Sequence, residues 1–324
     1  MALLRGNSQS FVDAPPARAG RHAGSSLTNR WLQRAGVRVG RLVFLAVVAL
    51  AAVACSSAPP VVETYPDDAA HRVVVDGVEI HYFDFGASST GTPIVWVHGY
   101  SGSAFEATYV EGELTGAHRL IAVDLPGSGY SEKPEIEYTV EYYVDFVQRF
   151  VNELGLERFI LVGHSMGGLI TGTLASRQPE GLEALILVAP YGLAGEAGTI
   201  PEFLADTGIL VDYGLELHNE TIIEAAMRAS VFHDPDRIPE DLVDYLKIST
   251  FHTANAIPAL ASVTRNIIAG VRDPTVLEQI EVPTLIIWGA EDRVLDFRYA
   301  AQFNRRIAES RLEAIPDCGH LPHV

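Results

Sequence analysis

The sequence predicts an α/β fold, in which a doubly wound, mostly parallel sheet carries a helical insertion after its sixth strand. Short, continuous apolar runs recur along the chain, as expected of central parallel strands that are covered on both faces. Segments with helical periodicity separate these runs. A glycine-rich turn at 163–167 joins one such strand to one such helix. Strands that alternate with helices in this way imply a parallel sheet with helices on both sides.

The sheet is expected to begin with an antiparallel hairpin. Residues 72–85 contain two strand-like runs around Asp76-Gly77, a dipeptide that favours a tight hairpin turn. The continuous apolar runs at 93–97 and 120–123 predict two central strands after this hairpin.

A helix is predicted next, over residues 140–154. Its valines and the final leucine share one face, and Gly155 stands where a C-terminal cap belongs. A further apolar run at 185–188 predicts the sixth strand.

Between these elements lies the most informative motif, G-x-S-x-G at 163–167. It follows an apolar strand at 158–162 and precedes small and apolar residues at helical spacing from 168 to 175. This arrangement is typical of a nucleophile elbow, whose glycines allow a sharp turn. We therefore predict that Ser165 is a nucleophile raised above the sheet edge, where the helix N-terminus favours developing negative charge.

The strand pattern stops between residues 191 and 278 and then returns. This stretch has helical periodicity and several prolines, which predicts a mostly helical insertion. Strand 284–288, helix 297–307 and strand 311–315 complete the sheet. The insertion carries large apolar side chains that are expected either to line an acyl pocket or to form its own core: Ile200, Phe203, Leu204, Ile209, Leu210, Val211 and Tyr213.

The N-terminal region has a different composition from the rest of the chain. Seven arginines and one acid give residues 1–41 a net charge of +6. Because the whole chain has a net charge of −18, residues 42–324 have a net charge of −18 − 6 = −24. Thirteen apolar residues follow at 42–54, which is short for a membrane span of about twenty residues. This pattern indicates an export signal. The acidic remainder disfavours binding to nucleic acid.

Residues 52–55, Ala-Val-Ala-Cys, are similar to a bacterial lipobox. We therefore predict an exported lipoprotein of the bacterial cell envelope that is anchored to the membrane through acylated Cys55. An uncleaved N-terminal anchor and a plain cleaved signal are the alternatives. The predicted organisation is a signal region (1–55), a tether (56–70), the sheet domain in two parts (71–190 and 279–324) and the insertion (191–278).

A serine nucleophile needs a base and a group that orients the base. After a nucleophile elbow these follow in the chain order acid, then histidine, at the carboxyl ends of strands. Asp292 and His320 meet this requirement, because each comes just after a predicted strand. Glu291 and Asp296 are rival candidates for the acid.

The negative charge of a tetrahedral intermediate needs hydrogen-bond donors aimed at it. We assign the backbone N–H groups of Met166, directly after the serine, and of Tyr100, in the loop after strand 93–97. His98 in the same loop is expected to be structural.

No metal site and no cofactor are expected, since the sequence has no CxxC and no clustered histidines and cysteines. Cys318 is expected to be a small buried hydrophobic residue rather than a nucleophile. The expected partner is a small-molecule ester or lipid substrate.

With these motifs, residues 71–324 resemble the α/β-hydrolase superfamily. The resemblance implies that the insertion is a cap over the active site and that the protein is an exported lipase- or esterase-like serine hydrolase of carboxylic esters. The alternatives are hydrolysis of carbon–carbon bonds in diketones and a non-catalytic binding protein. The resemblance also implies a C-terminal helix after the histidine loop, whereas four residues follow His320, so we expect a truncated domain. The motifs are His98-Gly99, 124–131, 163–168, 289–292 and Gly319-His320.

Overall fold

The computed structural model describes residues 69–192, 228, 231–251, 253–268 and 273–324. The apolar segment 42–54, Cys55 and the apolar residues named between 200 and 213 lie outside this part of the chain. None of the helices in the described ranges combines the length and the apolar character that a membrane span requires.

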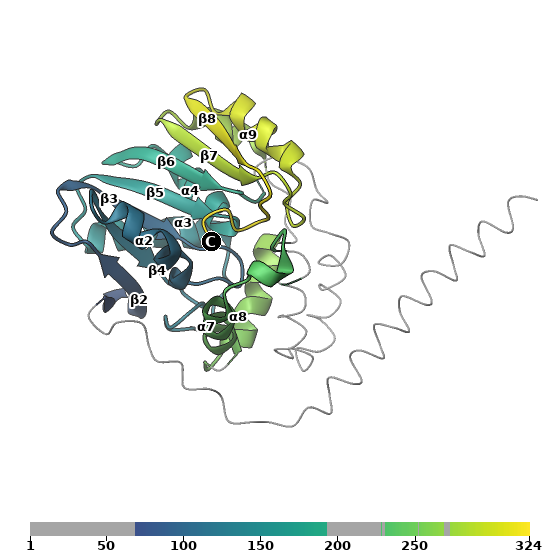
Figure 1. Ribbon diagram of the computed structural model, residues 1–324. Coiled ribbons are helices and arrows are strands. Elements are labelled where there is room, and N and C mark those ends of the chain that lie inside the picture. Colours follow the sequence, from purple (N-terminus) through teal and green to yellow (C-terminus); the bar gives the residue numbers. More distant parts are fainter. Residues whose placement is uncertain (1–68, 193–227, 229–230, 252, 269–272) are drawn as a thin grey trace, which may run out of the picture. The chain divides into compact units, whose positions relative to one another are not determined.

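Eight strands form one sheet in the order β1-β2-β4-β3-β5-β6-β7-β8 (Figure 1). The β1–β2 and β2–β4 pairs are antiparallel, and all other neighbours are parallel. The predicted hairpin and the predicted mostly parallel sheet are therefore confirmed. The strands are β1 (Ala70–Val75), β2 (Val78–Phe85), β3 (Gly91–Val97), β4 (His118–Val123), β5 (Phe159–His164), β6 (Leu182–Val188), β7 (Thr284–Gly289) and β8 (Ser310–Ile315).

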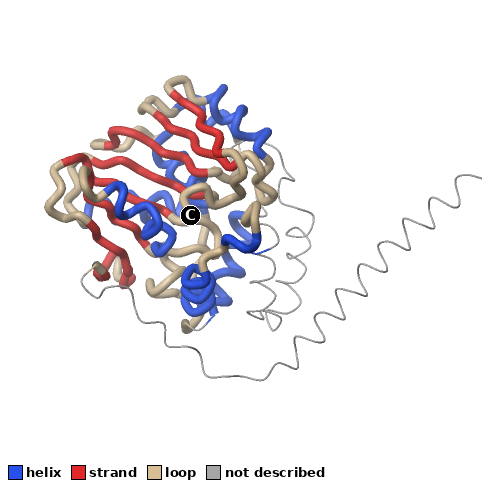
Figure 2. Tube along the Cα trace, in the orientation of Figure 1, coloured by secondary structure: helices blue, strands red, loops and turns tan. Residues whose placement is uncertain are grey.

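Helices lie on both faces of this sheet, as Figure 2 shows by the blue segments on either side of the red strands. On one face, α3 (Val140–Glu153), α4 (Met166–Ser176) and α9 (Ala300–Arg306) pack on alternate strand residues such as Val95 and Leu161. On the other face, Trp96 and Val162 belong to a second core with Phe105 and Tyr245. Those two rings come from the 3₁₀ helix η1 (Ala104–Ala107) and from α7 (Glu240–Phe251).

The ends of α3 show why the sequence specifies this helix. The Thr139 hydroxyl accepts a hydrogen bond of 3.1 Å from Tyr142 N–H and so caps the first turn. Gly155 has φ 64°, the left-handed conformation that ends many helices. By contrast, α2 (Thr108–Leu114) was absent from the prediction, because this helix is short and none of its residues is fully buried.

The described parts of the predicted insertion are helical and contact the loops of the sheet domain. Besides α7, they include α8 (Ala256–Val263), the π-helix η4 (Thr264–Ile268) and the 3₁₀ helices η3 (Pro235–Arg237) and η5 (Pro274–Gln279). Tyr100 O–H donates to Thr264 Oγ1 at 2.7 Å, since the Thr264 hydroxyl itself donates to the Leu260 carbonyl. Tyr191 O–H donates to the Ile268 carbonyl at 2.6 Å. The first of these bonds ties the insertion to the loop at the carboxyl end of β3, and the second joins the start of the insertion to η4.

Candidate active site

The loops that follow β3, β5, β7 and β8 lie at one edge of the sheet, because all four strands are parallel. In this kind of sheet, ligands bind at the carboxyl ends of the strands. The loops carry Tyr100, Ser165, Asp292 and His320, in that order. The structure therefore places all the side chains of the predicted triad at the same edge.

Ser165 lies in a strained turn between β5 and α4. Its φ of 50° and ψ of −115° are unusual for a residue other than glycine, and such strain is often concentrated at functional sites. Two backbone hydrogen bonds of 2.9 Å hold the turn, from Ser165 N–H to the Val188 carbonyl and from Tyr191 N–H to the Ser165 carbonyl. The carboxyl end of β6 thus fixes the position of the elbow.

Gly167 lies where α4 passes close to the end of β3. A Cβ atom at this position would collide with the backbone oxygens of Val97 and His98. We expect Gly167→Ala to lower the free energy of unfolding by about 3 kcal/mol, because main-chain atoms of the central strand would have to shift. Urea unfolding monitored by circular dichroism measures this change. Gly112→Ala is the matched control, since a Cβ there would contact nothing within 4 Å in α2. Equal losses in the two variants would contradict the prediction.

Asp292 and His320 form a buried pair. The distance from His320 Nδ1 to Asp292 Oδ2 is 2.8 Å, and the Asp292 side chain is fully buried. The other carboxylate oxygen, Oδ1, accepts hydrogen bonds of 2.8 Å from Val294 N–H and Leu295 N–H. With its Nδ1 proton donated to the carboxylate, a neutral His320 keeps Nε2 free to act as a base.

The two rival acids do not contact His320. Glu291 is exposed. Asp296 accepts a hydrogen bond of 2.9 Å from Arg298 N–H and caps the 3₁₀ helix η6 (Phe297–Tyr299). Within the described ranges, Asp292 is therefore the acid in the position that orients His320.

Two backbone hydrogen bonds hold His320 beside the elbow. His320 N–H donates to the Val231 carbonyl at 2.8 Å, and the His164 ring donates from Nε2 to the His320 carbonyl at 3.1 Å. The described part of the chain shows no hydrogen bond between Ser165 Oγ and the His320 ring. Catalytic hydrogen bonds are often long before substrate binds and shorten in the complex.

The loop after β3 passes directly beside Ser165. A Cβ atom on Gly99 would lie 3.2 Å from Ser165 Cβ. Among the hydrogen bonds between described residues, none uses the N–H group of Tyr100 or of Met166. Within the described structure, these two predicted oxyanion-hole donors thus have no backbone acceptor.

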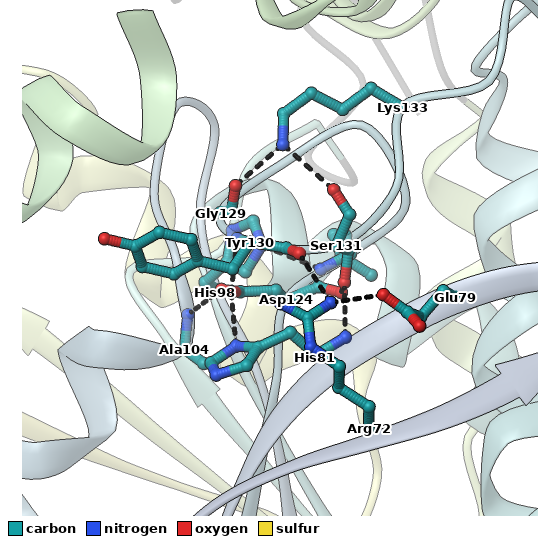
Figure 3. Close-up of polar contacts among 11 residues, drawn as sticks. Arg72, Glu79, His81, His98, Ala104, Asp124, Gly129, Tyr130, Ser131 and Lys133 are labelled. Atoms are coloured by element: carbon teal, nitrogen blue, oxygen red, sulfur yellow. Dashed lines mark hydrogen bonds and ion pairs between the residues drawn. The ribbon is translucent and has the colours of Figure 1, made fainter. Parts of the chain in front are cut away.

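Asp124 directly follows β4, and its side chain lies among the loop after β3, His81 of β2 and the Tyr130 loop (Figure 3). Its buried carboxylate accepts hydrogen bonds from Ala104 N–H at 2.7 Å and from Tyr130 N–H at 2.8 Å, and contacts His81 Nδ1 at 2.8 Å. Burial works to raise the pKa of Asp124, but the hydrogen bond and charge of His81 outweigh it and lower the pKa. Asp124 thus links this loop to β2 and to the Tyr130 loop.

His98 has the structural role expected for it. Its Nδ1 lies 2.8 Å from the Gly99 carbonyl, and its Nε2 accepts a hydrogen bond of 3.1 Å from Leu125 N–H. Both ring nitrogens are therefore used to hold the turn. Cys318 differs from its expected position, because it is only partly buried. Burial and the charge of Asp292 raise the pKa of this thiol, so it is not activated as a nucleophile.

The sequence did not reveal a buried cluster of Glu106, His164 and His323 directly behind the elbow. His164 Nδ1 lies 2.9 Å from Glu106 Oε2, and His323 Nε2 lies 3.6 Å from the same oxygen. The only local signal was a charged residue, Glu106, within the otherwise apolar run 104–107.

This cluster is the group of possible metal ligands found within the described ranges, with ligand atoms that lie within 4.8 Å of one another. One of these ligand atoms, His323 Nε2, lies 3.6 Å from Glu106 Oε2, and the His323 ring packs against Trp96. In addition, the nearest nitrogen and oxygen of His164 and Glu106 already share a hydrogen bond. We therefore interpret the cluster as a hydrogen-bonded ion pair with an adjacent neutral histidine.

His323 is the neutral member of the cluster. Its ring is buried between His164 and Trp96, with ring centroids at 4.8 and 5.0 Å, and neither of its nitrogens forms a hydrogen bond within the described structure. Burial lowers the pKa of His323 to about 4. Its folded form is therefore unprotonated at neutral pH.

This lowered pKa makes stability depend on pH. Below about pH 6.5 the unfolded chain binds a proton at His323 that the folded chain does not bind, down to about pH 4. The free energy of unfolding should therefore decrease as the pH is lowered from about 6.5 to about 4, by about 1.4 kcal/mol per pH unit, or about 3 kcal/mol in total. We expect His323→Gln to remove this part of the pH dependence, as measured by urea unfolding at a series of pH values. The exposed His71→Gln should leave the slope unchanged. Parallel curves for wild type and His323→Gln would contradict the prediction.

The sheet order, the elbow and the loops around it define the class of protein as an α/β hydrolase. The family model described as alpha/beta hydrolase fold matches residues 92–324, and the chain belongs to this family. The protein is thus a hydrolase, and the predicted fold class and superfamily are confirmed.

The chain is similar to several hydrolases. It is 29% identical over 253 residues to the uncharacterized hydrolase YugF of Bacillus subtilis, covering 77% of this chain and 90% of that protein. It is 30% identical to the 2-hydroxy-6-oxo-2,4-heptadienoate hydrolase of Pseudomonas putida, covering 78% and 90%. A crystal structure of a membrane phospholipase A, described as a bacterial virulence factor, matches with a TM-score of 0.67 and 26% identity, covering 91% of this chain and 92% of that one.

Proposed function

We propose that the protein hydrolyses carboxylic esters through an acyl-enzyme intermediate on Ser165. The observation that carries this proposal is the buried Asp292–His320 pair, 2.8 Å apart, at the same sheet edge as the strained serine turn. A serine hydroxyl needs such a base to act as a nucleophile at neutral pH.

In the proposed mechanism, Ser165 Oγ attacks the ester carbonyl while His320 Nε2 takes the hydroxyl proton. The negative charge moves to the carbonyl oxygen, which the N–H groups of Met166 and Tyr100 stabilise. Collapse of this intermediate breaks the bond to the alcohol, and His320 returns the proton to the leaving oxygen. A water molecule, activated by His320, then hydrolyses the acyl-enzyme and releases the acid. Asp292 keeps the imidazole in the required tautomer and stabilises its positive charge.

The similarity to a membrane phospholipase A supports an ester as the substrate, because a phospholipase A cleaves carboxylic ester bonds. We further propose that residues 191–278 form a cap that bounds the acyl site. The hydrogen bond from Tyr100 to Thr264 supports this role, since it joins the insertion to the loop after β3. The hydrogen bond from Tyr191 N–H to the Ser165 carbonyl joins the first residue of the insertion to the elbow.

A second candidate function is hydrolysis of a carbon–carbon bond in a dienoate ketone. The 30% identity to a 2-hydroxy-6-oxo-2,4-heptadienoate hydrolase favours it. The same serine, histidine and oxyanion donors serve both reactions, so the geometry of the polar site does not separate them.

A substrate panel separates these functions. We expect the purified full chain to hydrolyse p-nitrophenyl esters and to react with a fluorophosphonate probe at Ser165, with little turnover of 2-hydroxy-6-oxo-dienoates. Acyl chains from two to sixteen carbons distinguish an esterase, which prefers short chains, from a lipase. Turnover of the dienoate with no ester hydrolysis would establish the second candidate. A folded protein that does neither and takes no probe would be a binding protein on a hydrolase scaffold.

We also propose that the protein is exported and anchored to the bacterial cell envelope through a lipid on Cys55. Each buried methylene of an acyl chain adds about 0.8 kcal/mol of membrane affinity, so several chains would hold the domain firmly. Metabolic labelling with an alkyne fatty acid should mark the wild-type protein but not Cys55→Ser. Labelling of both proteins, or of neither, would refute the lipid anchor.

A further inference from the structure

The buried Glu106–His164 pair connects three loops of the candidate active site. Glu106 belongs to η1, which follows the loop after β3 (residues 98–103, called the oxyanion loop below), and His164 directly precedes Ser165. The His164 ring donates through Nε2 to the carbonyl of His320 at 3.1 Å. Its Nδ1 lies 2.9 Å from Glu106 Oε2. Both side chains are about 95% buried, with 4% and 5% exposed.

The other carboxylate oxygen of Glu106 faces the oxyanion loop. A Cβ atom on Gly102 would collide with Glu106 Oε1, so only glycine leaves room for the carboxylate at this point. A single carboxylate therefore packs on the oxyanion loop and contacts the residue before the nucleophile. Through the His164 ring it also reaches the backbone of the histidine loop.

The hydrogen bonds fix the number of protons in this pair. The His320 carbonyl can only accept, so His164 Nε2 must carry a proton. The contact between Nδ1 and Oε2 needs a second proton. Burial works to raise the pKa of Glu106, but the charge and hydrogen bond of His164 outweigh it and hold the pKa far below its usual range. The pair thus holds two protons, one on His164 Nε2 and one in the contact between His164 Nδ1 and Glu106 Oε2.

We propose that Glu106 is a positioning residue that, through His164, holds the backbone of His320 in place beside Ser165. This proposal rests on the proposed function, because it assigns His320 as the base. Without Glu106, the buried His164 ring loses its partner at Nδ1, so neither its tautomer nor its orientation is fixed and its bond to the His320 carbonyl is weakened. A displacement of about 1 Å in a catalytic group can lower the rate about 100-fold.

Two variants separate positioning from a merely structural role. Glu106→Leu leaves the Nδ1 atom of the buried His164 ring without its hydrogen-bond partner, so it should lose both stability and activity. The double variant Glu106→Leu/His164→Leu replaces the whole ion pair by apolar side chains, which often restores stability. However, the double variant still lacks a donor to the His320 carbonyl.

The experiment measures the urea midpoint, the rate of fluorophosphonate labelling at Ser165, and kcat and KM for p-nitrophenyl butyrate in the full chain. We expect kcat to fall about 100-fold in Glu106→Leu, with KM within about threefold of wild type. In the double variant the urea midpoint should recover, whereas kcat and the labelling rate should stay low. The kcat of Glu106→Gln should be at least about tenfold higher than that of Glu106→Leu. The glutamine amide can donate to Nδ1 of a neutral His164, which keeps both hydrogen bonds of the ring.

Asp84→Leu is the matched control. It breaks another ion pair of a mostly buried carboxylate, Asp84 with Arg119 at 2.6 and 2.9 Å, in β2 and β4. It should lower the urea midpoint without changing kcat per labelled serine.

Several outcomes would overturn the proposal. If activity recovers together with stability in the double variant, Glu106 has only a structural role. One equivalent of zinc in the purified wild type, absent from Glu106→Leu, would make the cluster a metal site instead. A folded wild type that takes no fluorophosphonate would refute the proposed function and, with it, the positioning role. Normal labelling of the wild type with unchanged labelling of the double variant would refute the positioning role alone.

Discussion

Ser165→Ala is expected to lower kcat for ester hydrolysis by about 10⁶-fold, which is the scale of loss when a serine hydrolase loses its nucleophile. The variant has no oxygen to form the acyl-enzyme, and its remaining activity would come only from the oxyanion donors and from binding. KM should change little, since the substitution removes a single hydroxyl group and keeps the Cβ atom. Steady-state kinetics with p-nitrophenyl butyrate and the loss of fluorophosphonate labelling provide the measurement.

Ser103→Ala is the matched control for this variant. Ser103 lies in the neighbouring loop, and its buried hydroxyl has no hydrogen-bond partner within the described structure. The same chemical change there should leave kcat within about twofold of wild type, as for substitutions away from catalytic groups. Retention of activity by Ser165→Ala would mean that another residue is the nucleophile.

The sequence was sufficient to predict the sheet and the edge that carries the site. Continuous apolar runs identify central strands such as β3 (Gly91–Val97) and β5 (Phe159–His164), because both faces of these strands are buried. Parallel strands end at a common edge, so chain order alone brings the loops of Ser165, Asp292 and His320 together.

The contacts behind that edge could not be predicted in the same way. Glu106 and His164 are 58 residues apart, and their pairing follows from the packing of η1 against the elbow rather than from a local pattern. His323 joins them from the end of the chain, where the sequence shows no periodic signal. Likewise, α2 escaped prediction because none of its side chains is fully buried, although Tyr109, Val110 and Leu114 pack against the core. Sequence periodicity reports burial against water, whereas these features depend on contacts between distant segments.

Asp292→Asn is expected to lower kcat by about 10⁴-fold at neutral pH, because it would favour the wrong tautomer of His320. Asp292 Oδ1 is already committed to two backbone donors, Val294 N–H and Leu295 N–H, so an asparagine would keep its oxygen there. Its NH₂ group would then occupy the place of Oδ2, 2.8 Å from His320 Nδ1, and would donate to that nitrogen. The proton of a neutral His320 would move to Nε2, which could no longer accept the proton of Ser165.

The pH profile of kcat/KM and the rate of fluorophosphonate labelling both report this change, since each requires a free Nε2. Glu291→Gln is the matched control, because it removes the adjacent carboxylate, which is exposed. Its kcat should stay within about twofold of wild type. If Glu291→Gln instead loses activity and Asp292→Asn keeps it, the orienting acid is Glu291, and the buried carboxylate only caps the turn formed by Val294 and Leu295.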